Sequence, residues 1–222
     1  MLSNADNKTN AVIVKNSLRG LYAITPDCAD SKALVQMIAA ALTGGARFIQ
    51  YRQKNAHPQD QASRARELND LCRASRGALI VNDNVELAQQ INAAGVHLGR
   101  DDMSVAEARL KLGTHKIIGV SCYNQMALAE SAIASGADYI AFGAFFPSQT
   151  KPSAVRAELA LITEAKKKFN IPVVAIGGIS LQNAPQLIAA GADALAVISD
   201  LFNAPNISTH ASAFQQLFSE KD

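Results

Sequence analysis

The sequence has little cysteine and no marked excess of charge of either sign. Its three cysteines, Cys28, Cys72 and Cys122, lie far apart and form no CxxC pair, so we expect reduced thiols rather than a disulfide framework or a zinc site. The 21 basic and 19 acidic residues leave a formal net charge of +2. Nucleic-acid-binding proteins usually carry a clear basic excess, so we expect no nucleic-acid partner.

Long apolar runs are also missing. The N-terminal stretch holds only AVIV at residues 11–14, whereas a signal-peptide core needs about 7 to 15 apolar residues and a membrane-spanning helix about 18. Hydrophobic residues make up 49% of the chain, as is usual for a globular protein. We therefore expect a cytoplasmic protein without a membrane partner, in which residues 1–16 form a polar N-terminal extension and residues 17–222 form one catalytic domain.

What the sequence does contain is a regular alternation of short β-rich runs and longer segments with helical periodicity. The β-rich runs lie at residues 21–25, 47–52, 78–83, 95–99, 116–122, 139–146, 172–178 and 194–200. Runs that are apolar on both faces and joined by helices are typical of a parallel sheet covered by helices. Eight such units predict an α/β protein, a single (β/α)8 TIM barrel with a short N-terminal extension. A doubly wound open sheet is the alternative, although it usually has about five or six strands.

Polar residues gather at the carboxyl ends of the predicted strands, where TIM barrels have their active sites. In chain order they are Gln50, Arg52, Lys54, Asn82, Asp83, His97, Asp101, Asp102, Ser121, residues 148–151, Gly177, Gly178, Ile198, Ser199 and Asp200. This one-sided placement indicates an enzyme.

The stretch FIQYRQK turns cationic at its end. Alternate residues of a strand share one face, so Gln50, Arg52 and Lys54 are predicted to point together into the mouth of the barrel. Half-buried cations need a neighbouring anion, which predicts an anionic ligand. Solvated strand ends are the alternative.

Asp83 and Asp102 follow two adjacent predicted strands. A lone aspartate in such a loop often caps the following helix, and this interpretation stays open. Two carboxylates facing a cationic mouth also suit Mg²⁺, which usually takes one or two carboxylates together with substrate phosphates. Cations beside an expected Mg²⁺ site predict a diphosphate substrate.

A second anion site is expected after the last two strands. GGIS, with Gly178, and VISD, with Ile198 and Ser199, lie where barrels often bind phosphate through backbone N–H groups. PSQTK adds hydroxyl and ammonium donors, although it can be an ordinary turn, and glycines also serve packing. His97 is left open between a buried structural histidine and a direct role. Together these features predict two phosphorylated small-molecule substrates.

The phrases QYRQK, VND, GVHLGRDD, IIGVS, FGAFFPSQTK, PVVAIGGIS and AVIS occur in this order between Leu21 and about Phe202. In that order and spacing they resemble the thiamine-phosphate synthase family. The resemblance implies a Mg²⁺-dependent transferase that joins a hydroxymethylpyrimidine diphosphate to a thiazole ethyl phosphate, carboxylated or not. It also implies a dissociative mechanism, in which pyrophosphate leaves first and the thiazole nitrogen captures a carbocation.

The resemblance assigns roles residue by residue. The catalytic residues would be Arg52, Lys54, Ser121 and Lys151. The pyrimidine diphosphate would be bound by Gln50, Tyr51, Arg52, Gln53, Lys54, Asn82, Ser121 and Lys151. The thiazole phosphate would be bound by Ser148, Gln149, Thr150, Gly178, Ile198 and Ser199, and Mg²⁺ by Asp83 and Asp102.

The sequence departs from the family pattern at three places. Ser148 replaces the usual threonine and keeps its hydroxyl; Arg100 adds a cation that could pair with Asp102; and Tyr123 stands where a histidine is often found. That histidine is the acid–base group of a sister thiazole tautomerase, which is therefore the nearest alternative. A non-catalytic binder of thiamine precursors and another phosphate-binding barrel are further alternatives. The oligomeric state is left open, with a homo-oligomer allowed.

Overall fold

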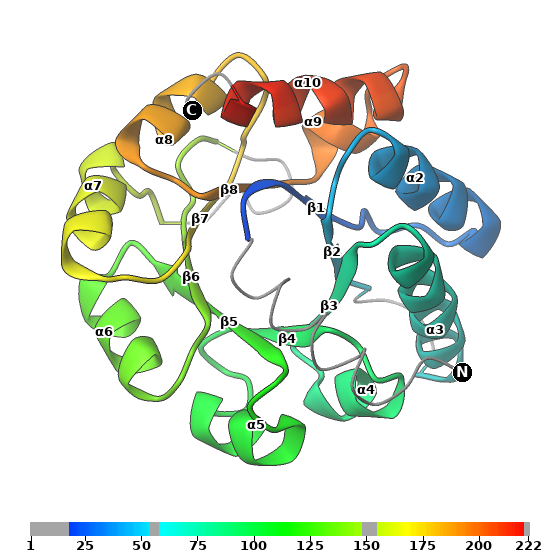
Figure 1. Ribbon diagram of the computed structural model, residues 1–222, viewed down its shortest axis with the longest axis horizontal. Helices are drawn as coiled ribbons and strands as arrows, with labels where there is room; N and C mark the ends of the chain where they lie inside the picture. Colours follow the sequence, from blue (N-terminus) through cyan, green and yellow to red (C-terminus); the bar gives the residue numbers. More distant parts are fainter. Residues whose placement is uncertain (1–17, 54–57, 148–154, 220–222) are drawn as a thin grey trace.

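The computed structural model describes residues 18–53, 58–147 and 155–219. In this part of the chain eight parallel strands pair in sequence order, and β8 pairs with β1 to close the barrel (Figure 1). The predicted (β/α)8 fold is therefore confirmed. The predicted N-terminal extension, residues 1–16, lies outside the described residues.

Each strand overlaps one of the predicted β-rich runs. The strands are β1 (Gly20–Ile24), β2 (Phe48–Tyr51), β3 (Ala78–Asn82), β4 (Gly95–Leu98), β5 (Ile117–Tyr123), β6 (Tyr139–Phe142), β7 (Val173–Ile176) and β8 (Ala194–Val197). Two of the predicted runs extend three or more residues beyond the end of their strand. The sixth strand ends at Phe142, where the chain leaves the sheet, and the eighth ends at Val197, where Ile198 turns the backbone into a short helix.

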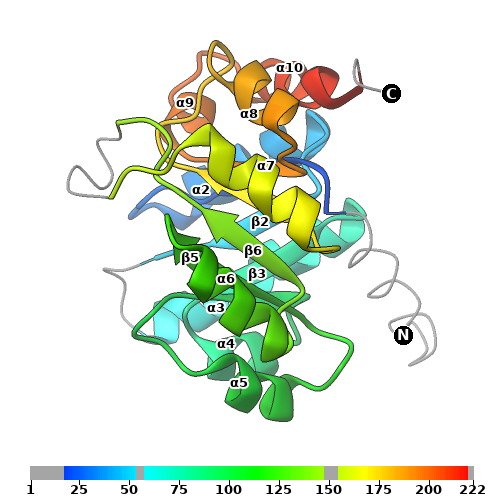
Figure 2. The ribbon, with the colours of Figure 1, turned by 90° about the vertical axis from the view of Figure 1, so that its left-hand side faces the viewer.

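Helices surround the barrel on its outside (Figure 1). They are α2 (Ser31–Thr43), α3 (Pro58–Ala74), α4 (Val85–Gln90), α5 (Val105–Leu112), α6 (Met126–Ala134), α7 (Leu159–Lys168), α8 (Ala184–Ala190), α9 (Ser199–Phe202) and α10 (Ile207–Ser219). The side view places α8, α9 and α10 on one flank of the barrel and α4 and α5 on the opposite flank (Figure 2). None of the helices in the described ranges is both long and apolar enough to cross a membrane.

The strands separate two apolar layers, because successive side chains of a strand point to opposite faces. Ile49, Tyr51 and Val81 face outward and pack with the helices in the larger cluster. Tyr22 and Tyr139 face inward and belong to the smaller cluster that fills the barrel. The interior layer therefore includes two phenolic hydroxyls in a position where apolar residues are more usual.

Candidate active site

A cavity of about 1080 Å³ opens at the carboxyl ends of the strands. Every strand contributes to its lining, from Tyr22 on β1 to Ala196 on β8. Pockets for single small ligands are usually about 300 to 1000 Å³. This cavity therefore lies at the upper end of the size range for small-ligand pockets.

Most of the predicted site residues that the structure describes line this cavity. They are Gln50, Arg52, Asn82, Ser121, Gly178, Ile198 and Ser199, and His97 joins them. Lys54, Ser148, Gln149, Thr150 and Lys151 lie outside the described residues. Tyr51, Gln53, Asp83 and Asp102 are described but are not part of the lining.

Tyr51 points away from the cavity. It is 3% exposed and packs in the outer layer between the strands and the helices. Since strand side chains alternate between faces, Tyr51 cannot share the inward face of Gln50. The Tyr51 side chain therefore belongs to the core, and a contact of Tyr51 with the pyrimidine diphosphate stays a prediction.

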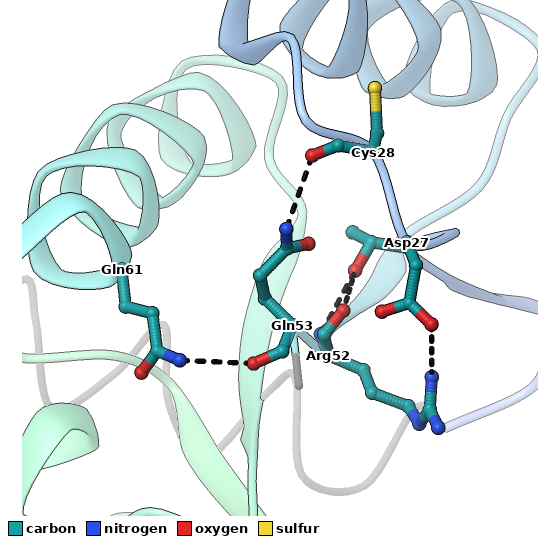
Figure 3. Close-up of polar contacts among 6 residues, drawn as sticks. Asp27, Cys28, Arg52, Gln53 and Gln61 are labelled. Atoms are coloured by element: carbon teal, nitrogen blue, oxygen red, sulfur yellow. Dashed lines mark hydrogen bonds and ion pairs between the residues drawn. The ribbon is translucent and has the colours of Figure 1, made fainter. Parts of the chain in front are cut away.

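Arg52 has a backbone that is fixed on both sides. The hydroxyl of Thr25 donates to the carbonyl oxygen of Arg52 and accepts from its N–H, each at 2.9 Å. One guanidinium nitrogen, Nη1, lies 3.4 Å from Oδ2 of Asp27, whose side chain is 47% exposed (Figure 3). A half-exposed pair of this kind contributes little to stability, about 0 to 1 kcal/mol. Arg52 is thus a well-placed cation whose counter-ion is easily exchanged.

Gln53 supports the strand end instead of facing the cavity. The side-chain amide of Gln53 donates to the carbonyl oxygen of Cys28 at 3.1 Å. The side-chain amide of Gln61 donates to the backbone carbonyl oxygen of Gln53, also at 3.1 Å (Figure 3). These bonds tie the end of β2 to the loop after β1 and to α3. Gln53 thus has a supporting position in this structure, and its direct contact with substrate stays a prediction.

A row of buried polar side chains crosses the interior of the barrel. Gln50 Nε2 donates to the hydroxyl of Tyr22 at 3.2 Å, and the hydroxyls of Tyr22 and Tyr139 lie 2.9 Å apart. His97 bonds through Nδ1 to the Tyr139 hydroxyl and through Nε2 to Ser121 Oγ, both at 2.8 Å. The row joins five strands, and its Gln50 and Ser121 ends both line the cavity.

The protonation states of this row follow from its burial. Removal from water disfavours charged forms, and it lowers the pKa of His97 to about 4, although the carboxylate of Asp102 acts in the opposite direction. Burial also raises the pKa of Tyr22 and Tyr139 above the ordinary value for tyrosine. At neutral pH the row is therefore uncharged, with a neutral imidazole and two protonated phenols.

Tyr22 and Tyr139 are functional candidates that sequence reasoning missed. Both lie inside runs that were assigned as apolar strands, and a tyrosine in such a run is usually a packing residue. Their hydroxyls acquire a role only when the barrel closes, because Tyr22 and Tyr139 are 117 residues apart in the chain.

Neither predicted metal ligand serves as a helix cap. The N-cap of α4 is Asn84, whose side chain accepts from the Leu87 N–H, and the N-cap of α5 is Ser104, which forms a capping box with Glu107. The capping alternative for Asp83 and Asp102 is therefore excluded. Oδ2 of Asp102 instead accepts the N–H of Gly99 at 2.6 Å and closes the loop after β4.

The described residues contain no group of three or more His, Cys, Asp or Glu side chains suited to a metal ion. Mg²⁺ sites that use substrate phosphates need only one or two carboxylates. A Mg²⁺ site built from Asp83, Asp102 and a phosphorylated substrate thus stays a prediction.

Arg100 lies in the loop after β4, with its guanidinium carbon 4.8 Å from the ring centroid of Tyr123. Both residues line the cavity. Within the described ranges Arg100 forms no ion pair with Asp102, so the pairing that could have weakened a metal site is not present. A cation over an aromatic ring is held by the negative face of that ring.

The opposite wall of the cavity is built by the loops after β7 and β8. Gly178 has a φ of 60°, and a Cβ at this position would lie 2.2 Å from the carbonyl oxygen of Pro147. Only glycine allows this close approach of two loops. The amide of Asn183 donates to the Gly178 carbonyl at 3.0 Å and accepts the Ser180 N–H at 2.9 Å, which fixes the turn.

A second histidine reaches this wall from the last helix. His210 on α10 places Nε2 at 2.7 Å from Oδ2 of Asp200 at the start of α9, and both side chains line the cavity. No motif in the sequence pointed to His210, because α10 enters the site only through the tertiary fold.

Comparison with known proteins is consistent with this architecture. A model of the family described as thiamine monophosphate synthase matches residues 21–201. Thiamine-phosphate synthases of an Azoarcus species and of Methylobacillus flagellatus are 53% and 52% identical over 201 residues, which cover 90% of this chain and 98% and 96% of theirs. A solved structure of thiamine phosphate pyrophosphorylase from Pyrococcus furiosus is 32% identical, covers 92% of this chain and 97% of its own, and superposes with a TM-score of 0.81.

Matches of this extent define both family and reaction class. Thiamine-phosphate synthases are transferases that condense a pyrimidine and a thiazole moiety with release of pyrophosphate, and this chain is a transferase of that kind. The chain belongs to the thiamine monophosphate synthase family.

Proposed function

We propose that the enzyme joins a hydroxymethylpyrimidine diphosphate to a thiazole ethyl phosphate, carboxylated or decarboxylated, and releases thiamine monophosphate and pyrophosphate. One observation carries the proposal. A single cavity collects polar side chains from β2 to β5 on one wall and glycine-rich loops after β7 and β8 on the other. The first wall suits a diphosphate, and the second suits a monophosphate.

On the diphosphate wall, Arg52 supplies a positioned guanidinium, and Gln50, Asn82 and Ser121 supply neutral donors beside it. Lys54 and Lys151, which lie outside the described residues, keep their predicted roles as further cations. Preorganised donors of this kind stabilise negative charge as it develops on a leaving pyrophosphate.

On the monophosphate wall, Gly178, Ile198 and Ser199 all line the cavity, and Gly178 has no side chain that could cover its own backbone. Ser148, Gln149 and Thr150, outside the described residues, keep their predicted roles as further phosphate contacts. Thiazole bound here would face the pyrimidine across one continuous cavity.

Asp83 and Asp102 would hold the proposed Mg²⁺. Their loops follow β3 and β4 next to Asn82 and His97, and hard carboxylate oxygens are the ligands that Mg²⁺ prefers. When bound, Mg²⁺ would neutralise charge on the diphosphate and so make pyrophosphate a better leaving group.

The proposed mechanism is dissociative. Arg52 and the Ser121 hydroxyl would bind diphosphate oxygens and take up the charge that forms as the carbon–oxygen bond breaks. The resulting pyrimidine-stabilised cation would be captured by the thiazole nitrogen, which is already aligned in the same cavity. Such a reaction needs no strong base, which agrees with a neutral, fully hydrogen-bonded His97.

The enzyme is also proposed to act on small phosphorylated molecules in the cytoplasm. The proposal rests on the three widely spaced cysteines, Cys28, Cys72 and Cys122, which suit a reducing compartment.

The decisive experiment mixes the purified protein with both substrates and follows thiamine phosphate and pyrophosphate. We expect equal amounts of the two products with Mg²⁺ and no turnover after chelation by EDTA. Absence of product from active substrates would overturn the proposal, and turnover that EDTA leaves unchanged would overturn its Mg²⁺ part. A third incubation with carboxylated thiazole phosphate alone tests the sister tautomerase, since isomerisation there would favour that alternative.

A further inference from the structure

We propose that Gln50, Tyr22, Tyr139 and His97 form a one-way hydrogen-bond chain that directs the hydroxyl proton of Ser121 into the cavity. The proposal makes Tyr22, Tyr139 and His97 positioning residues. It goes beyond the proposed function and relies on it only for the identity of the group that receives the proton.

The direction begins at Gln50. Its amide nitrogen can only donate, so the Tyr22 oxygen accepts this bond at 3.2 Å. The single proton of Tyr22 is then available for the neighbouring hydroxyl, and the Tyr139 oxygen 2.9 Å away accepts it. The proton of Tyr139 must in turn point to its remaining partner, Nδ1 of His97, at 2.8 Å.

The direction continues through the imidazole. A neutral histidine carries one proton, and acceptance at Nδ1 places that proton on Nε2. Nε2 therefore donates to Ser121 Oγ at 2.8 Å. The serine oxygen uses a lone pair for this bond, and its own proton remains free for another acceptor.

The cavity is where that acceptor lies. Ser121 lines the cavity and is half-buried, whereas Gln50, Tyr22, His97 and Tyr139 are all at most 8% exposed. In the described part of the chain, His97 is the side-chain partner of Ser121 Oγ, and no carbonyl oxygen accepts from this hydroxyl. A phosphate oxygen of the proposed pyrimidine diphosphate would complete the chain.

The barrel walls hold the chain in place. The rings of His97 and Tyr139 are stacked with centroids 5.6 Å apart, and the Tyr22 ring meets Tyr139 edge-on at 6.0 Å. Gly119 makes room for this arrangement, because a Cβ there would lie 1.9 Å from Cζ of Tyr139. The surrounding interior cluster is apolar, so it offers these buried polar groups no competing protein partner.

Nuclear magnetic resonance of the ligand-free protein tests the direction. The two ring nitrogens of His97 differ in shift according to which carries the proton, and His97→Gln identifies the signals by removing them. We expect a proton on Nε2 and none on Nδ1. A proton on Nδ1 would mean that Ser121 donates to His97, and the proposal would be wrong.

Gln50→Glu reverses the first bond, because an ionised carboxylate can only accept. Tyr22 must then donate to position 50, Tyr139 to Tyr22, and His97 Nδ1 to Tyr139. We expect the proton of His97 to move from Nε2 to Nδ1 as the introduced carboxyl ionises, within about pH 7 to 9 for a buried group. An unchanged tautomer over this range contradicts a chain in which direction is transmitted.

Kinetics of two phenylalanine variants supply the second readout. Tyr139→Phe removes the donor to His97 and should lower kcat about tenfold, the scale of one lost hydrogen bond, with little change in KM. Tyr22→Phe changes the same chain one step further from His97; because Tyr139 can still donate to His97, kcat should fall less, by about threefold. Equal losses in the two variants, at equal melting temperatures, would overturn the proposal.

The two proposals fail separately. The tautomer of His97 is measured without substrates, whereas thiamine phosphate formation needs both. A protein with the expected tautomer but no product would overturn the proposed function and leave the chain intact.

Discussion

Arg52 combines a fixed backbone with a side chain whose present partner is weak. Thr25 holds its N–H and carbonyl, and Asp27 pairs with its guanidinium at the edge of the cavity. A substrate diphosphate can therefore replace Asp27 without rearranging the strand. The conformational entropy of the Arg52 backbone is lost during folding, so it does not weaken substrate binding.

Arg52→Gln should lower kcat/KM about a hundredfold, because it removes a charge that acts on the leaving group. Arg66→Gln is the matched control, since Arg66 is an exposed arginine on α3 away from the cavity lining. Steady-state rates of pyrophosphate release measure both variants. A loss shared by the two would show that net charge, and not the position of Arg52, matters.

Asp102→Asn should raise the Mg²⁺ concentration needed for half-maximal rate by about tenfold or more, since it removes a charge but keeps an oxygen for the Gly99 N–H. A Mg²⁺ titration of the initial rate measures the effect. Asp70→Asn on the exposed side of α3 is the control. An unchanged Mg²⁺ dependence would assign Asp102 to loop structure alone.

The three thiols should differ in reactivity. Burial raises the pKa of Cys72 and Cys122 to about 12, so almost no thiolate forms at neutral or mildly alkaline pH, whereas Cys28 is partly exposed. Mass spectrometry after brief maleimide treatment should show a label on Cys28 in the native protein and on all three cysteines in denaturant. Early labelling of Cys72 would contradict the packing around α3.

At the scale of elements, the repeat of strand and helix could be predicted from the sequence because each unit carries a local signal. An apolar run, a helical period and a terminal glycine are all set within one short segment. The ends of β6 and β8 could not be predicted in this way. The predicted runs continue to residues 146 and 200, but the chain leaves the sheet earlier, at Phe142 and Val197.

The site residues, like the strands, were predictable from the sequence only where the signal is local. Gln50, Arg52, Asn82 and Ser121 were found because polar residues at strand ends are unusual and strand alternation gives their direction. The same alternation argues against Tyr51, which faces the helices. Tyr139 and His210 could not be found, because their partners are brought to them by the closed barrel and by α10.

Pairing of β5 with β6 depends on Gly119. Gly119→Ala should lower the free energy of unfolding by about 3 kcal/mol or more, because the added methyl overlaps the buried Tyr139 ring and the surrounding core is close-packed. Gly136→Ala is the comparison, since that glycine has a positive φ but open space around it, and it should cost only about 1 kcal/mol. Denaturant unfolding measures both. Similar losses would mean that Tyr139 can move aside.

At the scale of the whole molecule, the last helix ties the two ends of the chain together. Gln215 on α10 accepts the Leu21 N–H at 3.0 Å and donates to the Gly45 carbonyl, and Arg19 donates to the Phe218 carbonyl at 2.8 Å. The same helix lies beside α2 and α8 and carries His210 into the cavity (Figure 1). Closure of the barrel and completion of the site therefore depend on one element.

Gln215→Leu should destabilise the protein by about 1 to 3 kcal/mol, because it leaves the Leu21 N–H and the Gly45 carbonyl without this partner. Gln216→Leu changes the neighbouring, exposed residue and serves as the control. Thermal unfolding compares the stability of the two variants. Enzyme activity measured well below the unfolding temperature shows whether the folded variant still places His210 in the cavity. If the Gln215 variant were as stable as its control, the bonds of α10 to Leu21 and Gly45 would not be needed to close the barrel.

The pairing of β1 with β8 joins two strands that are synthesised at different times. β1 leaves the ribosome before its partner strand β8, which emerges about 170 residues later. During that interval one edge of the nascent sheet has free N–H and carbonyl groups that another chain could bind. The nascent sheet therefore stays open to misassembly until β8 has been made and has paired with β1.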